Sequence, residues 1–292
     1  MSLLSANLDC VSAEELMRRV MGDVFRPREA LTVSQWADRH RELDSKFSDR
    51  AGRWSTMVTP YMRGPMDAYN ASETREISFV KPAQVAGTEW LINTTGYIID
   101  MDPGNLMFVY PTEDTARETN ADRLIPALRR SEAVARHFGP SPRDTKVLAI
   151  NLDRMNIYFR GTNSEVQLDR VPAAIVIIDE LDRCNPRINV VEALRARLTT
   201  YDTRSKFLKT GTPSDEGVGI DREYKDADDR RQWHVPCPRC GQFHERYGRF
   251  GQVRWEKPDP ERPFDVDPQR VRDGAWFECP DCGGRIEGHE TR

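Results

Sequence analysis

The pattern of apolar and polar positions along the chain predicts alternating strands and helices. Residues 173–178 form an apolar run without polar alternation, which is typical of a central parallel strand covered by helices on both faces. Residues 76–80, the apolar run 106–110 and residues 206–209 are predicted as three further strands. We therefore expect an α/β fold with a mostly parallel sheet and helices on both of its faces.

Helices are predicted from apolar residues at helical spacing and from capping residues. The expected helices follow Ser12 and Pro60, cover residues 33–40 and 190–198, begin near Glu89, and extend from Thr112 to about Arg130. Residues 155–159 and 166–168 are expected to form a hairpin or a pair of edge strands before the central strand.

Two carboxylates, Asp179 and Glu180, follow the central strand directly. Open α/β sheets bind ligands at the carboxyl edge of their strands, so both side chains are expected at the mouth of a site. In nucleotide hydrolases the first carboxylate of such a pair holds Mg²⁺ and the second orients the attacking water. The pair fits this Walker B pattern, and the alternative is a solvated acidic turn after a core strand.

The loop at residues 81–88 joins a predicted strand to a predicted helix, which is the layout of a phosphate loop. Against the pattern G-x-x-x-x-G-K-[ST] only Thr88 matches, because Lys81, Ala86 and Gly87 occupy the positions of the two glycines and the lysine. Backbone N–H groups at the helix start still form an anion site, and Thr88 can offer its hydroxyl to Mg²⁺. Lys81 can supply the missing cation, and the alternative is an ordinary turn with a surface lysine.

The lack of a lysine at the usual position of the loop suggests substitutions that would restore it. Placing lysine at Gly87, with Ala86→Gly to relieve a positive φ, is expected to restore the usual loop and make Lys81 less important.

Other segments add weaker evidence for a nucleotide site. Thr210 and Thr212 follow the last predicted strand, where their hydroxyls can contact the γ-phosphate or its water, although the segment can also be a simple turn. Tyr61 precedes the first core strand by about one helix and can pack against adenine or against the core. The arginine-rich residues 117–136 suit a phosphate backbone or a solvated helix face, and Arg170 can reach a neighbouring subunit's nucleotide or balance Asp169.

Composition narrows the class of protein. The 292 residues are 31% charged and 38% hydrophobic, which is typical of a globular chain. The longest apolar run, residues 171–178, is too short to cross a bilayer, and the charged residues 1–20 lack the core of a signal peptide. We expect a cytoplasmic protein with no membrane partner. The net charge of −4 argues against a uniformly basic nucleic-acid coat.

Four of the six cysteines form two Cys-x-x-Cys pairs of nearly the same sequence. Cys237 and Cys240 lie in Cys-Pro-Arg-Cys-Gly, and Cys279 and Cys282 lie in Cys-Pro-Asp-Cys-Gly. Two such knuckles supply four thiolates to one tetrahedral Zn²⁺. Four protein ligands leave no open position, so the expected zinc is structural.

Taken in order, these motifs resemble the large subunit of tailed-phage terminase, GpA type. In that family a variant phosphate loop reading about K-x-A-Q-V-G-K-T-E precedes a V-I-I-D-E strand and a Cys-x-x-Cys pair. The residues that match the loop are Lys81, Ala83, Gln84, Val85, Thr88 and Glu89. Ala86 and Gly87 depart from it, so hydrolysis depends on Lys81 serving as the lysine. The resemblance implies nucleotide contacts along residues 84–89.

The resemblance also implies a fold and a function. It implies a P-loop NTPase core of the RecA/ASCE type at residues 59–232, an amino-terminal helical segment at 1–58 and a zinc-ribbon-like segment at 233–292. The implied function is an ATP-driven motor, using ATP and Mg²⁺, that moves double-stranded DNA into a procapsid in the host cytoplasm. The implied partners are the terminase small subunit, the portal and further copies of the chain in a ring. The family's metal-dependent endonuclease is expected in a further domain beyond this ATPase half.

Two other functions fit parts of the pattern. A superfamily 2 helicase shares the order phosphate loop, Tyr-Pro-Thr, Asp-Glu and Thr-Gly-Thr, but it requires a second RecA-like domain. A non-enzymatic adaptor would bind DNA through the zinc ribbon and no longer hydrolyse ATP. Nucleotide binding that depends on Lys81 discriminates between these two alternatives.

Overall fold

The computed structural model describes residues 12, 14, 17, 29–48, 50–163, 168, 172–201, 204–244, 252–256 and 267–287. Its centre is a seven-stranded sheet with the order β3-β9-β8-β4-β7-β6-β5, in which the first five strands are parallel. The strands are β3 (Glu76–Val80), β9 (Lys206–Gly211), β8 (Ile175–Ile178), β4 (Leu106–Tyr110), β7 (Asn156–Gly161), β6 (Ala149–Asn151) and β5 (Thr145–Lys146). The expected α/β fold with a mostly parallel sheet is confirmed.

The central strand β8 contributes to a hydrophobic core on each face of the sheet. Ile175 and Ile177 pack into one core, whereas Val176 and Ile178 pack into the other. Successive side chains of a strand point to opposite faces, so a strand with two covered faces must be apolar at every position. This requirement explains the unbroken apolar run in the sequence.

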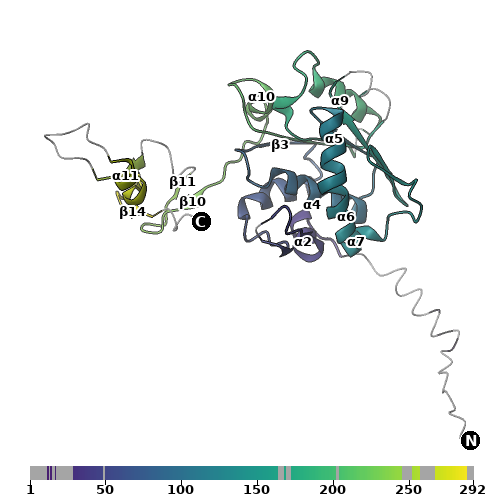
Figure 1. Cartoon of the computed structure of the whole chain (residues 1–292), viewed down its shortest axis with the longest axis horizontal. Coiled ribbons are helices and arrows are strands. Elements are labelled where there is room, and N and C mark those ends of the chain that lie inside the picture. The colour runs from purple at the N-terminus through teal and green to yellow at the C-terminus, as the bar shows by residue number, and fades with distance from the viewer. Residues whose placement is uncertain are drawn as a thin grey trace, which may run out of the picture.

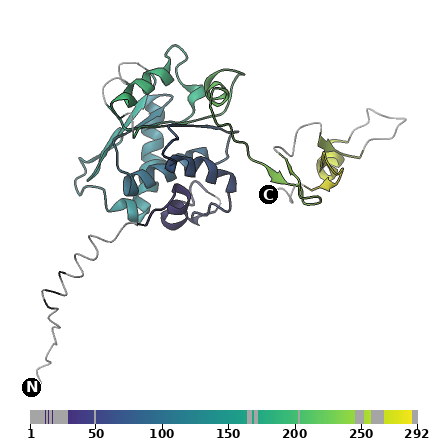
Figure 2. The same cartoon turned by 180° about the vertical axis from the view of Figure 1, so that it is seen from behind.

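Helices cover both faces of the sheet, as Figures 1 and 2 show. One face carries α2 (Val33–His40), α3 (Arg63–Asp67), α4 (Gly87–Met101), α5 (Glu113–Thr119), α6 (Ile125–Arg130) and α7 (Glu132–Ala135). The other face carries α9 (Val190–Leu198) and α10 (Gly219–Lys225). A π-helical turn, Asn120–Leu124, joins α5 to α6, so the predicted long helix is confirmed in extent but not in regularity. Most of the helix expected after Ser12 lies outside the described residues.

Residues before the first core strand pack into the same body as the sheet. Trp36 is fully buried, and its indole N–H donates to Asp100 Oδ2 at 2.9 Å. Its ring lies against α4, where a Cβ on Gly96 would come within 2.4 Å of Trp36 Cη2. A side chain at Gly96 would therefore push α2 away from α4. Several residues of this segment therefore share one hydrophobic core with the sheet, namely Leu31, Val33, Trp36, Ala37 and Trp54.

The first strand of the hairpin expected before the central strand pairs with a different segment from the one predicted. β7 pairs antiparallel with β6, whereas Leu168 is helical and buried in the core of the opposite face. Val166 lies outside the described residues. β6 has only three residues, and so short a strand gives little periodic signal.

The carboxyl-terminal part stands apart from this body and follows an extended segment after α10 (Figures 1 and 2). It contains the pair β10 (Val235–Pro236) and β11 (Phe243–His244), a three-stranded sheet and a helix. The sheet and helix are β12 (Val253–Arg254), β13 (Trp276–Glu278), β14 (Arg285–Ile286) and α11 (Pro268–Gly274). Among the described residues, no helix combines the length and apolar character needed to cross a membrane.

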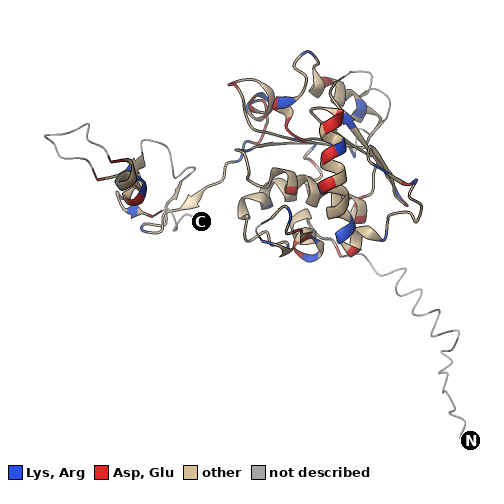
Figure 3. Ribbon diagram, in the orientation of Figure 1, with Lys and Arg blue, Asp and Glu red and all other residues tan. Residues whose placement is uncertain are grey.

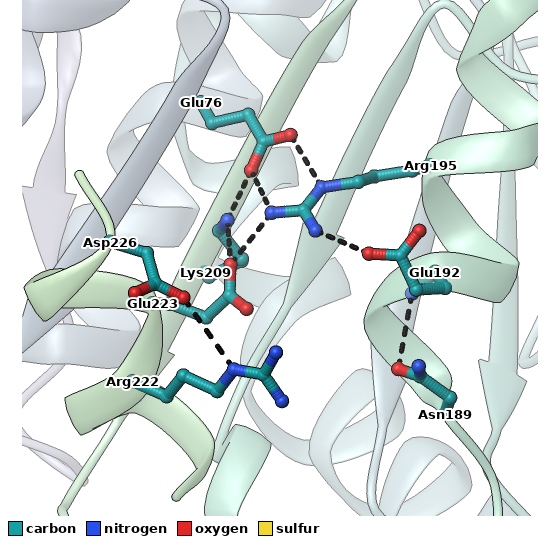
Figure 4. A network of polar contacts seen from close by, with 8 residues as sticks. All are labelled: Glu76, Asn189, Glu192, Arg195, Lys209, Arg222, Glu223 and Asp226. Atoms are coloured by element: carbon teal, nitrogen blue, oxygen red, sulfur yellow. Dashed lines mark hydrogen bonds and ion pairs between the residues drawn. The ribbon is translucent and has the colours of Figure 1, made fainter. Parts of the chain in front are cut away.

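A partly buried ion network fastens α9 and α10 to the edge of the sheet (Figure 4). Lys209 of β9, whose side chain is 2% exposed, pairs with Glu76 of β3 and with Glu223 of α10. Arg195 of α9 donates to both oxygens of Glu76 and to Glu223. Burial alone raises the pKa of Glu76, but the bonds from Arg195 and Lys209 lower it to about 2.

We expect Lys209→Met to destabilise the folded protein by about 3 kcal/mol, because it leaves Glu223 buried without its lysine. The exposed pair Arg222–Asp226 provides the control, and Arg222→Ala should change stability by less than about 0.5 kcal/mol. Urea unfolding of the parent and both variants measures the difference. Equal midpoints for all three proteins would contradict the role given to Lys209.

Candidate nucleotide-binding site and cysteine cluster

The carboxyl ends of β3, β9, β8 and β4 meet at one edge of the sheet. The backbone N–H of Lys81 donates to the carbonyl of Gly211 at 3.1 Å, which places the start of the loop at 81–88 beside the end of β9. Asp179 follows β8, the next strand in the sheet. The structure thus brings the three sequence motifs to one edge, as their positions after strands predict.

The loop at residues 81–88 has the backbone of an anion-binding turn. Gln84 and Ala86 adopt positive φ angles of 61° and 59°, and the loop ends at α4. No side chain caps the start of this fifteen-residue helix, whose first N–H groups and dipole favour an anion. The expected positive φ at Ala86 is confirmed. Such a conformation costs a non-glycine residue about 1–2 kcal/mol.

Lys81 lies over the first residue of α4. A Cβ built on Gly87 would come 2.2 Å from both Cδ and Cε of Lys81, and the lysine is 7% exposed. The stem therefore crosses the helix start and carries its ammonium from the other end of the loop to the anion site. Gly87 is where the usual pattern has lysine, and here its lack of a side chain makes room for Lys81. A lysine placed at Gly87 would collide with Lys81, so the substitutions suggested from sequence conflict with this packing.

Thr88 and Asp179 meet across the sheet edge. The Thr88 hydroxyl donates to Asp179 Oδ2 at 3.2 Å, while the buried Oδ1 has no hydrogen-bond partner among the described residues. Burial raises the pKa of Asp179, Lys81 opposes this rise and Glu180 adds to it. A hydroxyl beside a carboxylate with a spare oxygen is a suitable ligand set for Mg²⁺, which prefers oxygen ligands.

Glu180 has a left-handed backbone, with φ 55° and ψ 53°. Its carboxylate pairs with Arg183 at 3.1 Å and is partly exposed, in contrast to buried Asp179. Strained residues of this kind persist where the surrounding structure fixes them, often at functional sites. The two neighbouring carboxylates therefore have different surroundings, one buried beside Lys81 and one at the surface.

The other candidate residues are Thr210, Thr212 and Tyr61, and each has different surroundings. The Thr210 hydroxyl is fully buried and donates to the carbonyl of Phe79, so it is engaged inside the sheet, whereas Thr212 is exposed beyond the strand. Of the two threonines, only Thr212 has the exposure that phosphate sensing requires. Tyr61 is half-buried, and its ring meets Trp233 edge-on at 6.3 Å between centroids.

The carboxylate of Glu89 is engaged by two arginines. Arg41 donates to Oε2 at 2.7 Å, and Arg123 donates to Oε1 at 2.9 Å. These pairs fasten the first turn of α4 to the segment after α2 and to the π-helical turn. The acidic side chain therefore supports the loop from behind, and only its backbone remains for a nucleotide. Sequence reasoning missed Arg41 and Arg123, because each lies more than thirty residues from Glu89.

Most basic residues in the region from α5 to α7 form ion pairs or hydrogen bonds with side chains that lie close to them in the fold. Acidic and basic residues alternate along the ribbon of this region in Figure 3. The pairs are Arg117 with Glu113, Arg123 with Glu89, Arg130 with Asp44 and Arg136 with Asp100, and Arg129 donates to Thr145. This arrangement favours a paired helix face over a DNA-binding surface. Arg170 lies outside the described residues.

The four knuckle cysteines come together in the carboxyl-terminal part. The sulfur atoms of Cys237, Cys240, Cys279 and Cys282 all lie within 4.8 Å of one another. The Cys240 and Cys279 sulfurs are 3.9 Å apart, close to the ~3.8 Å that tetrahedral Zn–S bonds of about 2.3 Å require. The cluster is compatible with a zinc module.

The two knuckles have the same backbone geometry. Gly241 and Gly283 adopt φ angles of 74° and 67°, and each N–H donates to the carbonyl of the first cysteine of its pair. The amides of Arg239 and Gly284 approach Cys237 and Cys282 sulfur at 3.4 Å. Sequence reasoning did not single out His244, whose Nε2 lies 3.4 Å from Cys279 Sγ.

Comparison with known proteins identifies the family. The model of the family described as "Phage terminase large subunit gpA, ATPase domain" matches residues 48–292. The chain belongs to the phage terminase large subunit gpA family. This match includes the loop, the Asp179–Glu180 pair and both knuckles, so the recognised resemblance is confirmed.

Individual terminases agree with this assignment. The chain is 26% identical over 248 residues to the terminase large subunit of Enterobacteria phage P21, a match that covers 80% of the chain and 38% of that protein. It is 25% identical over 262 residues to that of Escherichia phage lambda, covering 85% of the chain and 40% of that protein. The chain thus spans about two fifths of these relatives.

A solved terminase structure has the same fold. The HK97 bacteriophage large terminase aligns with a TM-score of 0.51 at 9% identity, over 67% of this chain and 41% of that one. At this identity the likeness concerns the fold alone.

Asp179→Asn should stabilise the folded chain in the absence of ligand. Burial raises the pKa of Asp179 above the ordinary value of 3.8, so ionisation is harder in the folded state, and stability is lost as the pH rises from that value through the folded pKa. Asparagine keeps an oxygen for Thr88 and carries no charge. We expect a rise of a few degrees in Tm at pH 7, since ~1 kcal/mol is worth roughly 2–4 °C at this size. A lower Tm in scanning calorimetry would contradict this account.

Proposed function

We propose that this chain binds and hydrolyses Mg²⁺-ATP and supplies the ATPase of a motor that packages double-stranded DNA into a procapsid. The observation that carries this proposal is the meeting of Lys81, Thr88 and Asp179 at the start of α4. A cation, a hydroxyl and a buried carboxylate beside a helix amino terminus match the charge distribution of a metal-bound triphosphate.

Each residue has a distinct task in this proposal. The Lys81 ammonium binds the β- and γ-phosphate oxygens, and the amides at the start of α4 hold the remaining charge. Thr88 and Asp179 would hold Mg²⁺, which neutralises phosphate charge when bound. Glu180 orients the attacking water, for which its position next to Asp179 and its surface exposure are suitable. Exposed Thr212 is the threonine placed to sense the γ-phosphate.

Gln84, Val85, Ala86 and Gly87 form the backbone cradle in this proposal. Tyr61 remains a proposed adenine contact, and Glu89 acts through its backbone and its two arginines.

The wider function follows from the family. We propose double-stranded DNA, the terminase small subunit, the portal and further copies of the chain in a ring as its partners, and the name "Terminase, large subunit" of two relatives supports a small subunit among them. The action of the motor in the host cytoplasm is part of the same proposal.

We further propose that Cys237, Cys240, Cys279 and Cys282 bind one structural Zn²⁺. The spacing of the sulfurs and the two matching knuckles support this proposal. Few other groups hold this segment together, since its buried core consists of Cys237, Cys279 and Ile286 with Phe277 packed against it. Metal binding would then provide much of the folding free energy of the segment.

The nucleotide site is tested by comparing the parent with Lys81→Ala and Glu180→Gln, using the exposed Lys146→Ala as a matched control. Lys81→Ala should weaken ATP binding at least tenfold, since a buried charge-assisted contact is worth ~1.5–3 kcal/mol. Glu180→Gln should bind ATP like the parent and lose hydrolysis. Titration calorimetry and phosphate release measure the two effects.

Two outcomes would contradict the nucleotide proposal. Equal ATP affinity in the parent, Lys81→Ala and Lys146→Ala would remove Lys81 from the site. A parent that binds DNA firmly and binds no ATP would favour the non-hydrolysing adaptor.

The zinc proposal predicts one zinc per chain in the purified parent. Cys240→Ser should lose the metal and unfold the carboxyl-terminal segment, because three thiolates no longer close the site. Cys184→Ser alters a buried cysteine outside the cluster and should keep the zinc. Elemental analysis with thiol titration decides the question, and a folded, zinc-free parent with four reactive thiols would refute the site.

A further inference from the structure

Asp182 lies between two glycines, one at the end of β9 and one at the start of α10. It sits in the short turn Leu181–Arg183, directly after Glu180. A Cβ on Gly211 would come 2.2 Å from Asp182 Oδ2, and a Cβ on Gly219 would come 2.4 Å from Oδ1. The carboxylate therefore packs directly against the backbone at the end of β9 and at the start of α10, and any side chain at either glycine would displace it.

The groups around Asp182 hold its carboxylate in place but do not provide a hydrogen bond to both of its oxygens. The backbone N–H of Ile220 donates to Oδ1 at 3.4 Å, whereas the buried Oδ2 has no hydrogen-bond partner among the described residues. Burial raises the pKa of Asp182, and the amides of Ile220 and Ser214 oppose this rise. A buried oxygen without a hydrogen bond lowers the stability of the folded protein, and a smaller apolar residue at this position would avoid that loss. This cost points to a role other than stability.

The two glycines connect Asp182 to both the proposed nucleotide site and α10. The carbonyl of Gly211 accepts the N–H of Lys81, so the strand end that Asp182 contacts also holds the start of the loop at 81–88. Gly219, with φ 56°, begins α10, and α10 is fastened to the sheet through Glu223 (Figure 4). The chain continues from α10 to the cysteine cluster. Asp182 is therefore a side chain of the turn after Asp179 and Glu180 that contacts this route.

We propose that Asp182 is a positioning residue that couples the nucleotide site to α10, so that occupation of the site changes the exposure of the α10 backbone. This inference rests on the proposed function, because it requires a nucleotide at the loop. When the Asp179–Glu180 turn shifts, the carboxylate moves against Gly211 and Gly219, and the close packing on both sides passes the shift to β9 and α10. Coupling of this kind needs contiguous packed groups, which the two glycine contacts provide.

The experiment measures backbone hydrogen exchange with and without a non-hydrolysable ATP analogue and Mg²⁺. In the parent, the analogue should slow exchange both in the loop at 81–88 and in α10. Asp182→Ser removes the carboxylate that packs against both glycines, so the loop should still be protected while the response of α10 is lost. Analogue affinity should stay within about twofold, and ATP turnover should fall about tenfold.

Two further variants separate coupling from a general structural role. Gly211→Ala displaces the same carboxylate from the other side, so it should lower turnover like Asp182→Ser, and the double variant should lose no more than either single one. Asp226→Asn alters an exposed carboxylate at the end of α10 and should leave turnover and exchange unchanged. If Asp182→Ser does not fold, Asp182→Ala carries the same measurements.

The outcomes distinguish this inference from the proposed function. A parent whose loop at 81–88 gains no protection from the analogue would overturn the nucleotide site itself. A protected loop with the same α10 response in the parent and Asp182→Ser would overturn the coupling role and leave the nucleotide site intact. Multiplicative losses of turnover in the double variant would also overturn it, because the two residues would then act separately.

Discussion

The site depends on one packing arrangement, the passage of the Lys81 side chain over Gly87 at the start of α4. It places a cation, a helix amino terminus and the buried Asp179 within one small region. A carboxylate as buried as Asp179 is costly unless a positive charge is near, and Lys81 supplies part of that charge. The same ammonium can neutralise phosphate oxygens. The arrangement thus allows a loop without the usual lysine to keep the electrostatics of a phosphate site.

The sheet makes this arrangement possible, because parallel strands end at the same edge. β3 supplies the loop, β8 supplies the carboxylates and β9 lies between them. Both faces of β8 are covered by helices, so the strand is rigid and its carboxyl end is fixed. The ion pairs of Glu89 with Arg41 and Arg123 fix the first turn of α4 from the opposite side. The position of the loop is therefore determined by contacts from four separate parts of the chain.

Much of the fold and part of the site could be predicted from the sequence. The apolar run before Asp179 and the Cys-x-x-Cys spacing are local signals, and both led to correct expectations about the sheet and the cysteine cluster. Lys81 could be chosen as the cation because no other basic residue lies in the loop. The steric role of Gly87 could not be foreseen, since it depends on the path of the Lys81 stem.

Other features depend on contacts between distant segments. The hydrogen bond from the Thr210 hydroxyl to the carbonyl of Phe79 depends on the register of β9 beside β3. The pairing of β7 with β6 depends on a strand too short to give a pattern. The contact of Asp182 with two glycines requires the turn after β8 to meet the start of α10.

The most direct test of the account is a crystal structure with Mg²⁺ and a non-hydrolysable ATP analogue. The account predicts that Lys81 Nζ lies about 2.7–3.2 Å from a β- or γ-phosphate oxygen, with its stem still crossing Gly87. It also predicts that Thr88 and Asp179 lie at the metal. A triphosphate bound elsewhere, or bound at α4 with Lys81 turned away from it, would contradict the central claim.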